Sequence, residues 1–159
     1  MIRDNRTTFG VDQDVAQASG TFNFSNQIDL GAAGLDVGQG QPLYVVVVVT
    51  GGDDGVITGG SSGDIQFQVV SDDSASIATS GQSVHLISPL YVTDGNDANE
   101  LDQGDIAWCV ALPTEGHRPY ERFLGLQFIV GTTTITEGTV TAFLSLDPVG
   151  WKSYPDATN

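Results

Sequence analysis

Apolar and polar residues alternate along much of this chain with the two-residue period that is typical of half-buried β-strands. In segment 122–130, one face collects the apolar side chains Leu124, Leu126, Phe128 and Val130. In segment 138–146, one face collects Val140, Ala142, Leu144 and Leu146, and the opposite face collects Thr139, Thr141, Phe143 and Ser145. A Thr-rich connector joins the two segments, so we interpret them as a hairpin. One face would pack in the core and the other would present a surface.

Further strand candidates follow one another between Gly-rich or acidic turns. They are 21–30, 43–50, 64–71, 74–80, 83–92 and 106–113. The run LYVVVVVT at 43–50 is mostly β-branched and continuous, which predicts a central strand covered on both faces. Segment 64–71 places Ile65, Phe67 and Val69 on one face and two glutamines on the other. Segment 106–113 is predicted to be a buried strand that ends at a proline.

These patterns predict about eight strands with turn signals between them, and no stretch has the period of a long amphipathic helix. We therefore expect an all-β protein with little or no helix, a two-sheet antiparallel β-sandwich of the jelly-roll type. Residues 1–19 are expected to form an N-terminal arm or a peripheral strand, 20–148 the sandwich, and 149–159 an irregular C-terminal tail. The 159 residues are the size of one domain.

The charge of the chain narrows the possible partners. It has 20 acidic residues against 5 Lys and Arg, which gives a net charge of −15 at pH 7. Nucleic-acid binding depends on Lys and Arg meeting phosphates, so we expect no nucleic-acid partner. Anionic membrane surfaces would repel the chain as well, so we expect no membrane partner. The simplest role of the charge is solubility, and a halophile or marine origin would explain it without any function.

The number of cysteines and the N-terminal residues indicate the cellular compartment in which the protein is made. Cys109 is the single cysteine, which excludes an intrachain disulfide and a cysteine-based zinc site. Its position inside a predicted strand, beside Trp108, predicts a buried structural thiol. Residues 1–10 lack the apolar region of a signal peptide, and the apolar run at 42–51 is too short to span a bilayer as a helix. We expect a protein suited to a reducing cytosol, or to a place where no disulfide is needed.

Two patterns suggest catalysis and neither meets its requirements. The sequence GGSSG at 59–63 matches G-x-S-x-G around Ser61, but a nucleophile elbow needs a following helix and the next residues predict a strand. The only histidines, His85 and His117, lie in separate segments and cannot supply the ligand set of a metal-dependent jelly-roll enzyme. We expect His85 on a strand surface. The prediction is no enzyme, no catalytic residue, no cofactor and no metal.

The acidic segment 93–105 has some features of a calcium loop. Its candidate ligands are Asp94, Asn96, Asp102 and Asp105. The sixth position is Asn99 where an EF-hand requires glycine, and the twelfth is Asp105 where it requires glutamate. An ordinary solvated loop is favoured. A weak cation site shared with Asp53 and Asp54 remains the alternative.

A local excess of positive charge marks the best candidate for a partner interface. Arg118 and Arg122 are two of the five bases, and Tyr120 lies between them. Arginine and tyrosine are enriched in interface hot spots. The alternative is an ion pair within the chain, between one of these arginines and Glu115 or Glu121.

Four more residues complete the candidate interface. Phe143 lies on the Thr-rich face of the last predicted strand, where it would anchor a partner. Trp151, Lys152 and Tyr154 lie in the irregular tail, which either folds back onto the sandwich or anchors a partner.

Several segments together resemble the small jelly-roll capsid cement (decoration) proteins of tailed bacteriophages. The similar segments are SNQIDLG (25–31), GLDVGQGQPLYVVVVVT (34–50), IQFQVVSDDSA (65–75), ALPTEGHRPYERFLGLQFIVG (111–131) and GTVTAFLSLDP (138–148). The most specific part is a small-x-LP turn, then Y-x-R-F-L-x-L, then T-V-T-A-F-L. The segments span most of the chain. The N-terminal arm and the loop at 51–63 add nothing to the resemblance.

The resemblance implies a non-enzymatic structural role. Such proteins form small homo-oligomers on the outer face of an icosahedral phage head, where they bind the major capsid protein at junctions between capsomers and resist the pressure of packaged DNA. The expected localisation is the outer surface of the virion after synthesis in the host cytoplasm. A dimer on a local two-fold axis is favoured over a trimer on a local three-fold axis.

Two other classes of function are kept as alternatives. A carbohydrate-binding jelly roll, lectin-like or from a fibre, would stack sugars on Trp108, Trp151, Tyr120 and Tyr154 and hold calcium in its acidic loops. A hydrolase that uses Ser61 or an Asp pair is the third class.

Overall fold

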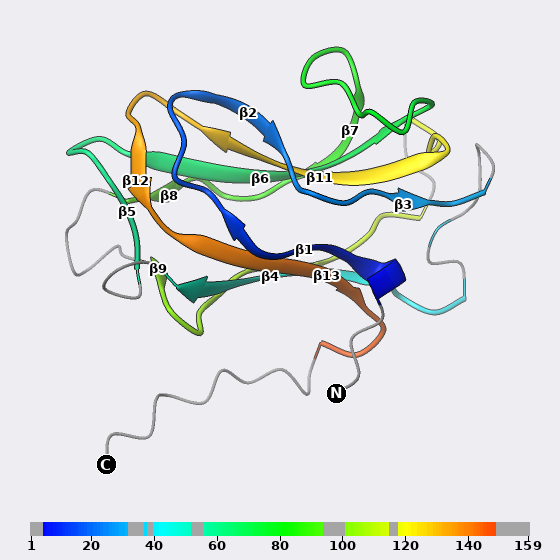
Figure 1. The fold of residues 1–159 in the computed structure, drawn as a ribbon. Helices are drawn as coiled ribbons and strands as arrows, with labels where there is room; N and C mark the ends of the chain where they lie inside the picture. Colours follow the sequence, from blue (N-terminus) through cyan, green and yellow to red (C-terminus); the bar gives the residue numbers. More distant parts are fainter. Residues whose placement is uncertain are drawn as a thin grey trace.

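The structure is a computed structural model that describes residues 5–31, 37, 40–51, 56–93, 101–114 and 118–148. Two antiparallel β-sheets are stacked face to face, and a small third sheet covers one end (Figure 1). Within these ranges the only helical element is the 3-10 turn η1 (Asn5–Thr7). None of the described segments forms a helix long and apolar enough to cross a membrane. The predicted all-β sandwich is confirmed.

The first sheet, sheet A, has the strand order β1-β13-β4-β10. Its strands are β1 (Thr8–Asp14), β13 (Thr139–Ser145), β4 (Tyr44–Gly51) and β10 (Ile106–Ala111). The β-branched strand β4 lies between β13 and β10, as the run of valines predicted. Val45, Val47 and Val49 face the core, and Val46 on the other face is also 0% exposed.

The second sheet, sheet B, has the order β2-β11-β6-β7. Its strands are β2 (Gly20–Asn23), β11 (Phe123–Val130), β6 (Asp64–Asp72) and β7 (Ser83–Ile87). Two short strands extend it, because β3 (Ile28–Asp29) pairs with β11 and β8 (Tyr91–Val92) pairs with β6. The longest register runs from Phe123 opposite Asp72 to Val130 opposite Ile65.

The third sheet, here called the end sheet, has the order β12-β5-β9. It consists of β12 (Ile135–Glu137), β5 (Val56–Gly59) and β9 (Leu101–Asp102). Ile57 and Ile135 contribute its fully buried side chains. Gly138 has φ +137 beside Ile57, a conformation and a close approach that favour glycine.

The core lies between sheets A and B and follows the predicted alternation. Leu124, Leu126, Phe128 and Val130 of β11 all face it. The Phe24 and Phe128 rings meet edge to face at a centroid distance of 5.7 Å. This arrangement is favourable for aromatic side chains beyond their buried area.

The predicted hairpin of 122–130 and 138–146 is wrong. Strand β11 pairs with β2, β3 and β6 in sheet B, whereas β13 pairs with β1 and β4 in sheet A. The connector crosses the end of the sandwich and includes β12. The apolar faces of β11 and β13 therefore pack toward each other across the core. A strand's apolar pattern shows which of its faces is buried, but it does not show which strand is its hydrogen-bonded neighbour.

Two other sequence expectations are corrected. Residues 74–80, predicted as a strand, contain no strand and form a bent segment. Cys109, predicted as buried, is exposed, because β10 is the edge strand of sheet A and not a central one. Partial burial nevertheless raises the pKa of the Cys109 thiol above its ordinary value.

On the outer face of sheet B, the centre of strands β6 and β11 is polar but buried. Gln127 of β11 is 0% exposed and Gln68 of β6 is 5% exposed. Segment 73–82, here called the cover segment, folds over them and contributes the amide of Gln82 and the carbonyl of Ala78 as partners. Gln66 and Gln68, predicted to face away from the core, do so: Gln68 is buried in the amide network under the cover segment, whereas Gln66 is partly exposed and donates to the carbonyl of Ser88.

Candidate partner interface

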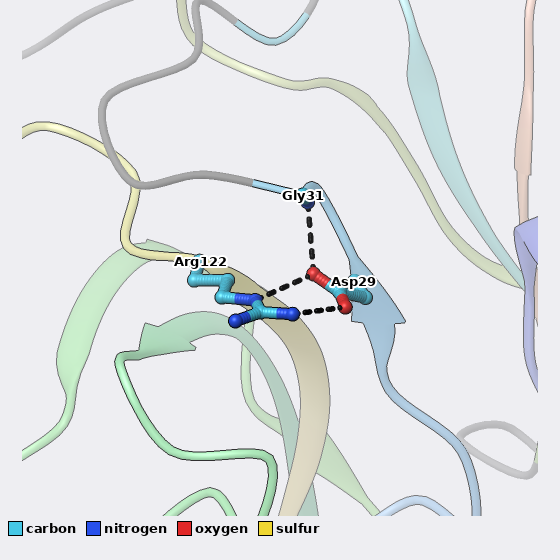
Figure 2. A network of polar contacts seen from close by, with 3 residues as sticks. All are labelled: Asp29, Gly31 and Arg122. Carbon is cyan, nitrogen blue, oxygen red and sulfur yellow. Dashed lines mark hydrogen bonds and ion pairs between the residues drawn. The ribbon is translucent and has the colours of Figure 1, made fainter.

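Arg122 stands at the start of β11 and is fixed by a carboxylate from β3 (Figure 2). Its Nε donates to Asp29 Oδ1 at 3.0 Å and its Nη2 donates to Asp29 Oδ2 at 2.9 Å. This bidentate geometry holds a guanidinium in one orientation. The backbone N–H of Gly31 donates to the same carboxylate at 2.8 Å. The predicted internal ion pair exists, but among the described residues its acid is Asp29 and not Glu121, and Glu115 lies outside the described residues.

The electrostatics of this pair follow from its hydrogen bonds. The guanidinium of Arg122, followed by the Gly31 N–H, holds the pKa of Asp29 below its ordinary value. The same contact raises the pKa of Arg122. About half of each side chain is exposed, so water screens the pair and its main effect is to join β3 to β11.

Tyr120 is a core residue and not a surface anchor. Its side chain is 2% exposed, and its hydroxyl donates to the carbonyl of Pro113 at 2.9 Å. Its ring packs on His85 with centroids 4.2 Å apart. Burial raises the pKa of Tyr120 to about 12. Tyr120 lies between two arginines in the sequence, but its ring points inward and packs in the core beside His85.

His85 is half-buried in β7 beside Tyr120. Its Nε2 lies 2.7 Å from the hydroxyl of Ser71, which also accepts the N–H of Glu121 at 3.0 Å. Burial, its largest influence, lowers the pKa of His85. The Ser71 side chain is 0% exposed, so this serine and histidine offer no accessible nucleophile. The contacts connect β6, β7 and the start of β11.

The remaining candidate interface residues differ in where the structure places them. Arg118 is exposed and makes no ion pair with the described residues. Phe143 is 2% exposed, so its ring is not at the surface of the single chain, which corrects its predicted role as an anchor. Trp151, Lys152 and Tyr154 lie outside the described residues.

The exposed apolar side chains at the edge of sheet B were missed by the sequence analysis. Ile87, Leu90 and Val92 are 55%, 54% and 39% exposed, and we call them the β7–β8 patch. Ile87 is opposite Gln68 and Val92 is opposite Asp64, two positions on the outward face of β6. A sequence signal was available, because apolar residues stand next to each other at 86–87 and 90–92 and a strand with one buried face cannot bury them all. In the structure only Leu86 and Tyr91 of this segment pack against the core.

The two edges of sheet A differ in the protection that they carry. Strand β1 has register shifts, a residue with φ 48 at Asp12, and acidic side chains. Such bulges and charges keep an edge from pairing with another chain. Strand β10, with the sequence IAWCVA, carries no charge and has one register shift. No described strand pairs with its outer edge, where only the Ala107 carbonyl accepts from the Tyr91 hydroxyl, so β10 is the better template for a further strand.

The serine and the described end of the acidic loop considered for chemistry both lie at turns. Ser61 lies in a turn followed directly by strand β6, so the geometry of a nucleophile elbow is absent there. Asp102 and Asp105 form a turn in which the Asp102 N–H donates to Asp105 Oδ2. Asp53, Asp54, Asp94, Asn96 and His117 lie outside the described residues. Within the described ranges no group of three or more His, Cys, Asp or Glu is placed to hold a metal ion.

The aromatic platform proposed for sugars is not formed by the residues that the structure places. Trp108 is 7% exposed and Tyr120 is 2% exposed, so neither ring can stack on a ligand. Trp151 and Tyr154 lie outside the described residues.

The fold and its surface define an antiparallel β-sandwich with an exposed apolar patch on one sheet and an uncharged edge strand on the other. The sequence model of the Bbp16 family matches residues 13–144, which is most of the chain, so the chain belongs to the Bbp16 family. No curated protein matches it.

Proposed function

We propose that this protein is a non-enzymatic structural protein of a virion, a capsid decoration protein that binds the outer face of an icosahedral phage head. Its partner would be the major capsid protein, whose subunits it would hold together. The observation that carries the proposal is the β7–β8 patch, because exposed apolar side chains gathered on one sheet edge mark a surface that a partner covers. The choice of the major capsid protein as the partner rests on the sequence resemblance to phage cement proteins.

The strand order supports a jelly-roll type of sandwich. Taking the strands on the main path of sheets A and B in chain order, the first and last (β1 and β13) are neighbours in sheet A, while the second and second-last (β2 and β11) are neighbours in sheet B. The middle strands continue the same alternation inward to β6 and β7. This nested order is what two Greek keys wrapped together produce.

The physical properties suit a protein that attaches to a shell from outside. A specific contact needs on the order of 1,600 Å² of buried surface in total, which is within reach of one face of a small sandwich. Side chains already held in a stiff sheet lose little conformational entropy on binding. The net charge of −15 keeps such a protein from binding the packaged DNA.

Self-association is part of the proposal, with a dimer favoured over a trimer. The uncharged edge of β10 is the surface that best fits a second copy, since antiparallel pairing of two β10 strands would satisfy both edges around a two-fold axis. Two linked copies would also engage neighbouring capsid subunits with increased avidity.

The test is the mass of the purified protein by light scattering, followed by co-pelleting with expanded, undecorated shells. We expect a discrete oligomer that pellets in a saturable ratio. Leu90→Asp is expected to abolish pelleting, whereas Leu146→Asp, a matched change at a leucine that is 56% exposed, is expected to retain it. A monomer that stays in the supernatant would refute the proposal.

The self-association surface has its own matched pair of variants. Cys109→Asp places a charge on the free β10 edge and is expected to give monomers. Val11→Asp places the same charge on the protected β1 edge, where Val11 is 56% exposed, and is expected to leave the oligomer intact. An oligomer that survives Cys109→Asp would move the interface away from β10.

A further inference from the structure

His85 lies at the point where the pairing between β6 and the edge strand β7 is interrupted. Val84 is opposite Val70 and Leu86 is opposite Val69, so the ladder passes over His85. This is the geometry of a β-bulge, which leaves one extra residue unpaired and re-aims its side chain. Strand β7 is the last strand on the path of sheet B, and among the described strands only β6 pairs with it. The contacts of the His85 side chain therefore bear on how firmly β7 is held.

The side chain of His85 meets a buried hydroxyl group that three segments share. Its Nε2 lies 2.7 Å from Ser71 Oγ on β6, and its ring packs on the ring of Tyr120. The same Ser71 oxygen accepts the backbone N–H of Glu121 at 3.0 Å. Beside it, the hydroxyl of Ser83 on β7 donates to Glu121 Oε1 at 2.6 Å. One hydroxyl group therefore connects β6, β7 and the segment that leads into β11.

The hydrogen bonds of Ser71 fix the protonation state of His85. Ser71 is 0% exposed, and among the described residues its Oγ has two polar partners, the N–H of Glu121 and Nε2 of His85. Since the backbone N–H is a donor, the hydroxyl hydrogen of Ser71 has Nε2 as its acceptor. An imidazole nitrogen accepts only when it carries no hydrogen. His85 is therefore neutral in this arrangement and carries its hydrogen on Nδ1.

Protonation of His85 is incompatible with this arrangement. A hydrogen on Nε2 would face the hydroxyl hydrogen of Ser71, and one of the two groups would have to turn away. Ser71 cannot turn its hydroxyl toward water, because its side chain has no exposed surface. A buried donor without an acceptor destabilises the contact that holds it. The contact between β6 and β7 at the bulge therefore depends on a neutral imidazole.

The charged and ionisable groups that act on His85 come mainly from segment 118–121. Burial, its largest influence, lowers the pKa of His85, the carboxylate of Glu121 raises it, and the guanidinium of Arg118 lowers it. Tyr120 stays neutral, since burial raises its pKa to about 12. Strand β6 contributes Asp72, whose carboxylate accepts hydrogen bonds from the cover segment instead. The described residues of β7 add no second ionisable group.

We propose that His85 is a pH-sensitive switch that holds the edge strand β7 on sheet B while its imidazole is neutral and releases it when the imidazole is protonated. With a folded-state pKa below the ordinary value of 6.5, the stabilising contribution is complete above pH 6.5 and is lost as the pH falls below it. Ile87 of the β7–β8 patch lies on the same strand, so release also changes the exposed apolar surface. The switch is a property of the free chain and does not depend on whether that patch binds a shell.

The test is NMR on the ¹⁵N-labelled full chain, with two measurements. Long-range ¹H–¹⁵N spectra of the imidazole ring are expected to show the Nδ1–H tautomer of His85 at neutral pH. His117→Gln leaves a single histidine signal for this measurement. Hydrogen-exchange protection of the β7 amides that pair with β6, corrected for intrinsic exchange, is expected to fall roughly ten-fold between neutral pH and about pH 5. Protection in β4 of sheet A is expected to stay constant over the same range.

Matched variants separate His85 from the charges beside it. His85→Gln offers an amide oxygen that accepts from Ser71 at every pH, so β7 is expected to stay protected in acid. Glu121→Gln removes a charge that favours the imidazolium, so the midpoint of the transition is expected to move to lower pH. Arg118→Gln removes a charge of the opposite sign and is expected to move the midpoint to higher pH.

Three results would overturn the proposal. They are the Nε2–H tautomer of His85 at neutral pH, protection of β7 that does not change with pH, and a pH dependence that survives His85→Gln. The tautomer is measured on a chain that is unchanged at position 85, so it decides the question even if His85→Gln fails to fold. Shell pelleting takes no part in these measurements, so the failure of either proposal leaves the other standing.

Discussion

The central strands of sheet B, β6 and β11, carry buried side chains on both of their faces, and the two faces are buried in different ways. The inner face packs Leu126 and Phe128 into an apolar core. The outer face packs Gln127 and Gln68 under the cover segment, where Gln68 Nε2 donates to Gln127 Oε1 at 2.7 Å. Apolar packing is tolerant of small displacements, whereas buried amides are stable only while each donor and acceptor keeps its partner. Strand β11 therefore has one face whose packing tolerates small displacements and one face whose stability depends on every hydrogen bond being kept.

The largest expected effect comes from the inner face. Phe128→Ala removes a ring that is 1% exposed and lies against Phe22 and Phe24. We expect a loss of about 3–5 kcal/mol in the free energy of unfolding, because the cavity collapses only partly. Denaturant unfolding with an unchanged m-value would measure it. If the free energy of unfolding fell no more than for a surface substitution, the core would be able to repack around the missing ring. The contrast drawn here between the two faces of β11 would then be wrong.

A smaller and more local effect is expected on the outer face. Gln127→Leu keeps the volume but removes the amide that Gln68, Gln82, Asn23 and Ala78 contact. We expect a loss of about 1–3 kcal/mol, because buried polar groups lose their partners. Hydrogen exchange should rise in segment 73–82 and remain slow in β4 of sheet A.

The control for this variant is Gln66→Leu, on the same face of sheet B. Gln66 donates to the carbonyl of Ser88 at 3.1 Å and takes no part in the amide network. Its replacement is expected to leave exchange in the cover segment unchanged. Equal effects of the two substitutions would show that the network has no special role.

The smallest expected effect is the dependence of the cover segment on pH. Hydrogen bonds from the backbone N–H groups of Ala78, first, and then Ser74 hold the pKa of Asp72 below its ordinary value of 3.8. The carboxylate therefore stabilises the fold above pH 3.8, and this contribution is lost as the pH falls through the lower pKa of the folded state. Asp72→Asn should remove the acid-dependent increase in exchange at Ala78. An unaltered increase would assign the effect to another group.

The sequence predicted the inner faces of the strands well and their neighbours poorly. The alternation placed Leu124 and Phe128 on the core side, and Ile65 and Phe67 likewise, because the period of two is a local property. The pairing of β11 with β6 and of β13 with β4 depends on contacts between distant segments. A run of two apolar strands joined by a polar connector fits a hairpin and a crossing between sheets equally well.

The candidate interface shows the same limit in its individual residues. Arginine and tyrosine at positions 118, 120 and 122 alternate, which places Tyr120 between two exposed arginines without revealing that its ring is buried. The partner of Arg122 is Asp29, far away in sequence, so nearby glutamates were the wrong place to look for it. The buried amide network of Gln127 depends on the cover segment, whose bent conformation carries no periodic signal.

The pairing of β1 with β13 has a consequence for how the protein is made. Strand β13 is hydrogen-bonded to β1 on one side and to β4 on the other, so it is the strand that unites sheet A. A ribosome delivers β1 first and β13 only after every other strand described. Until then β1 and β4 lack the strand that joins them, and their apolar side chains stay available to chaperones and to neighbouring chains. Folding is expected to finish only after β13 has left the ribosome, and slowly, because its closing contacts join the most distant segments of the sandwich.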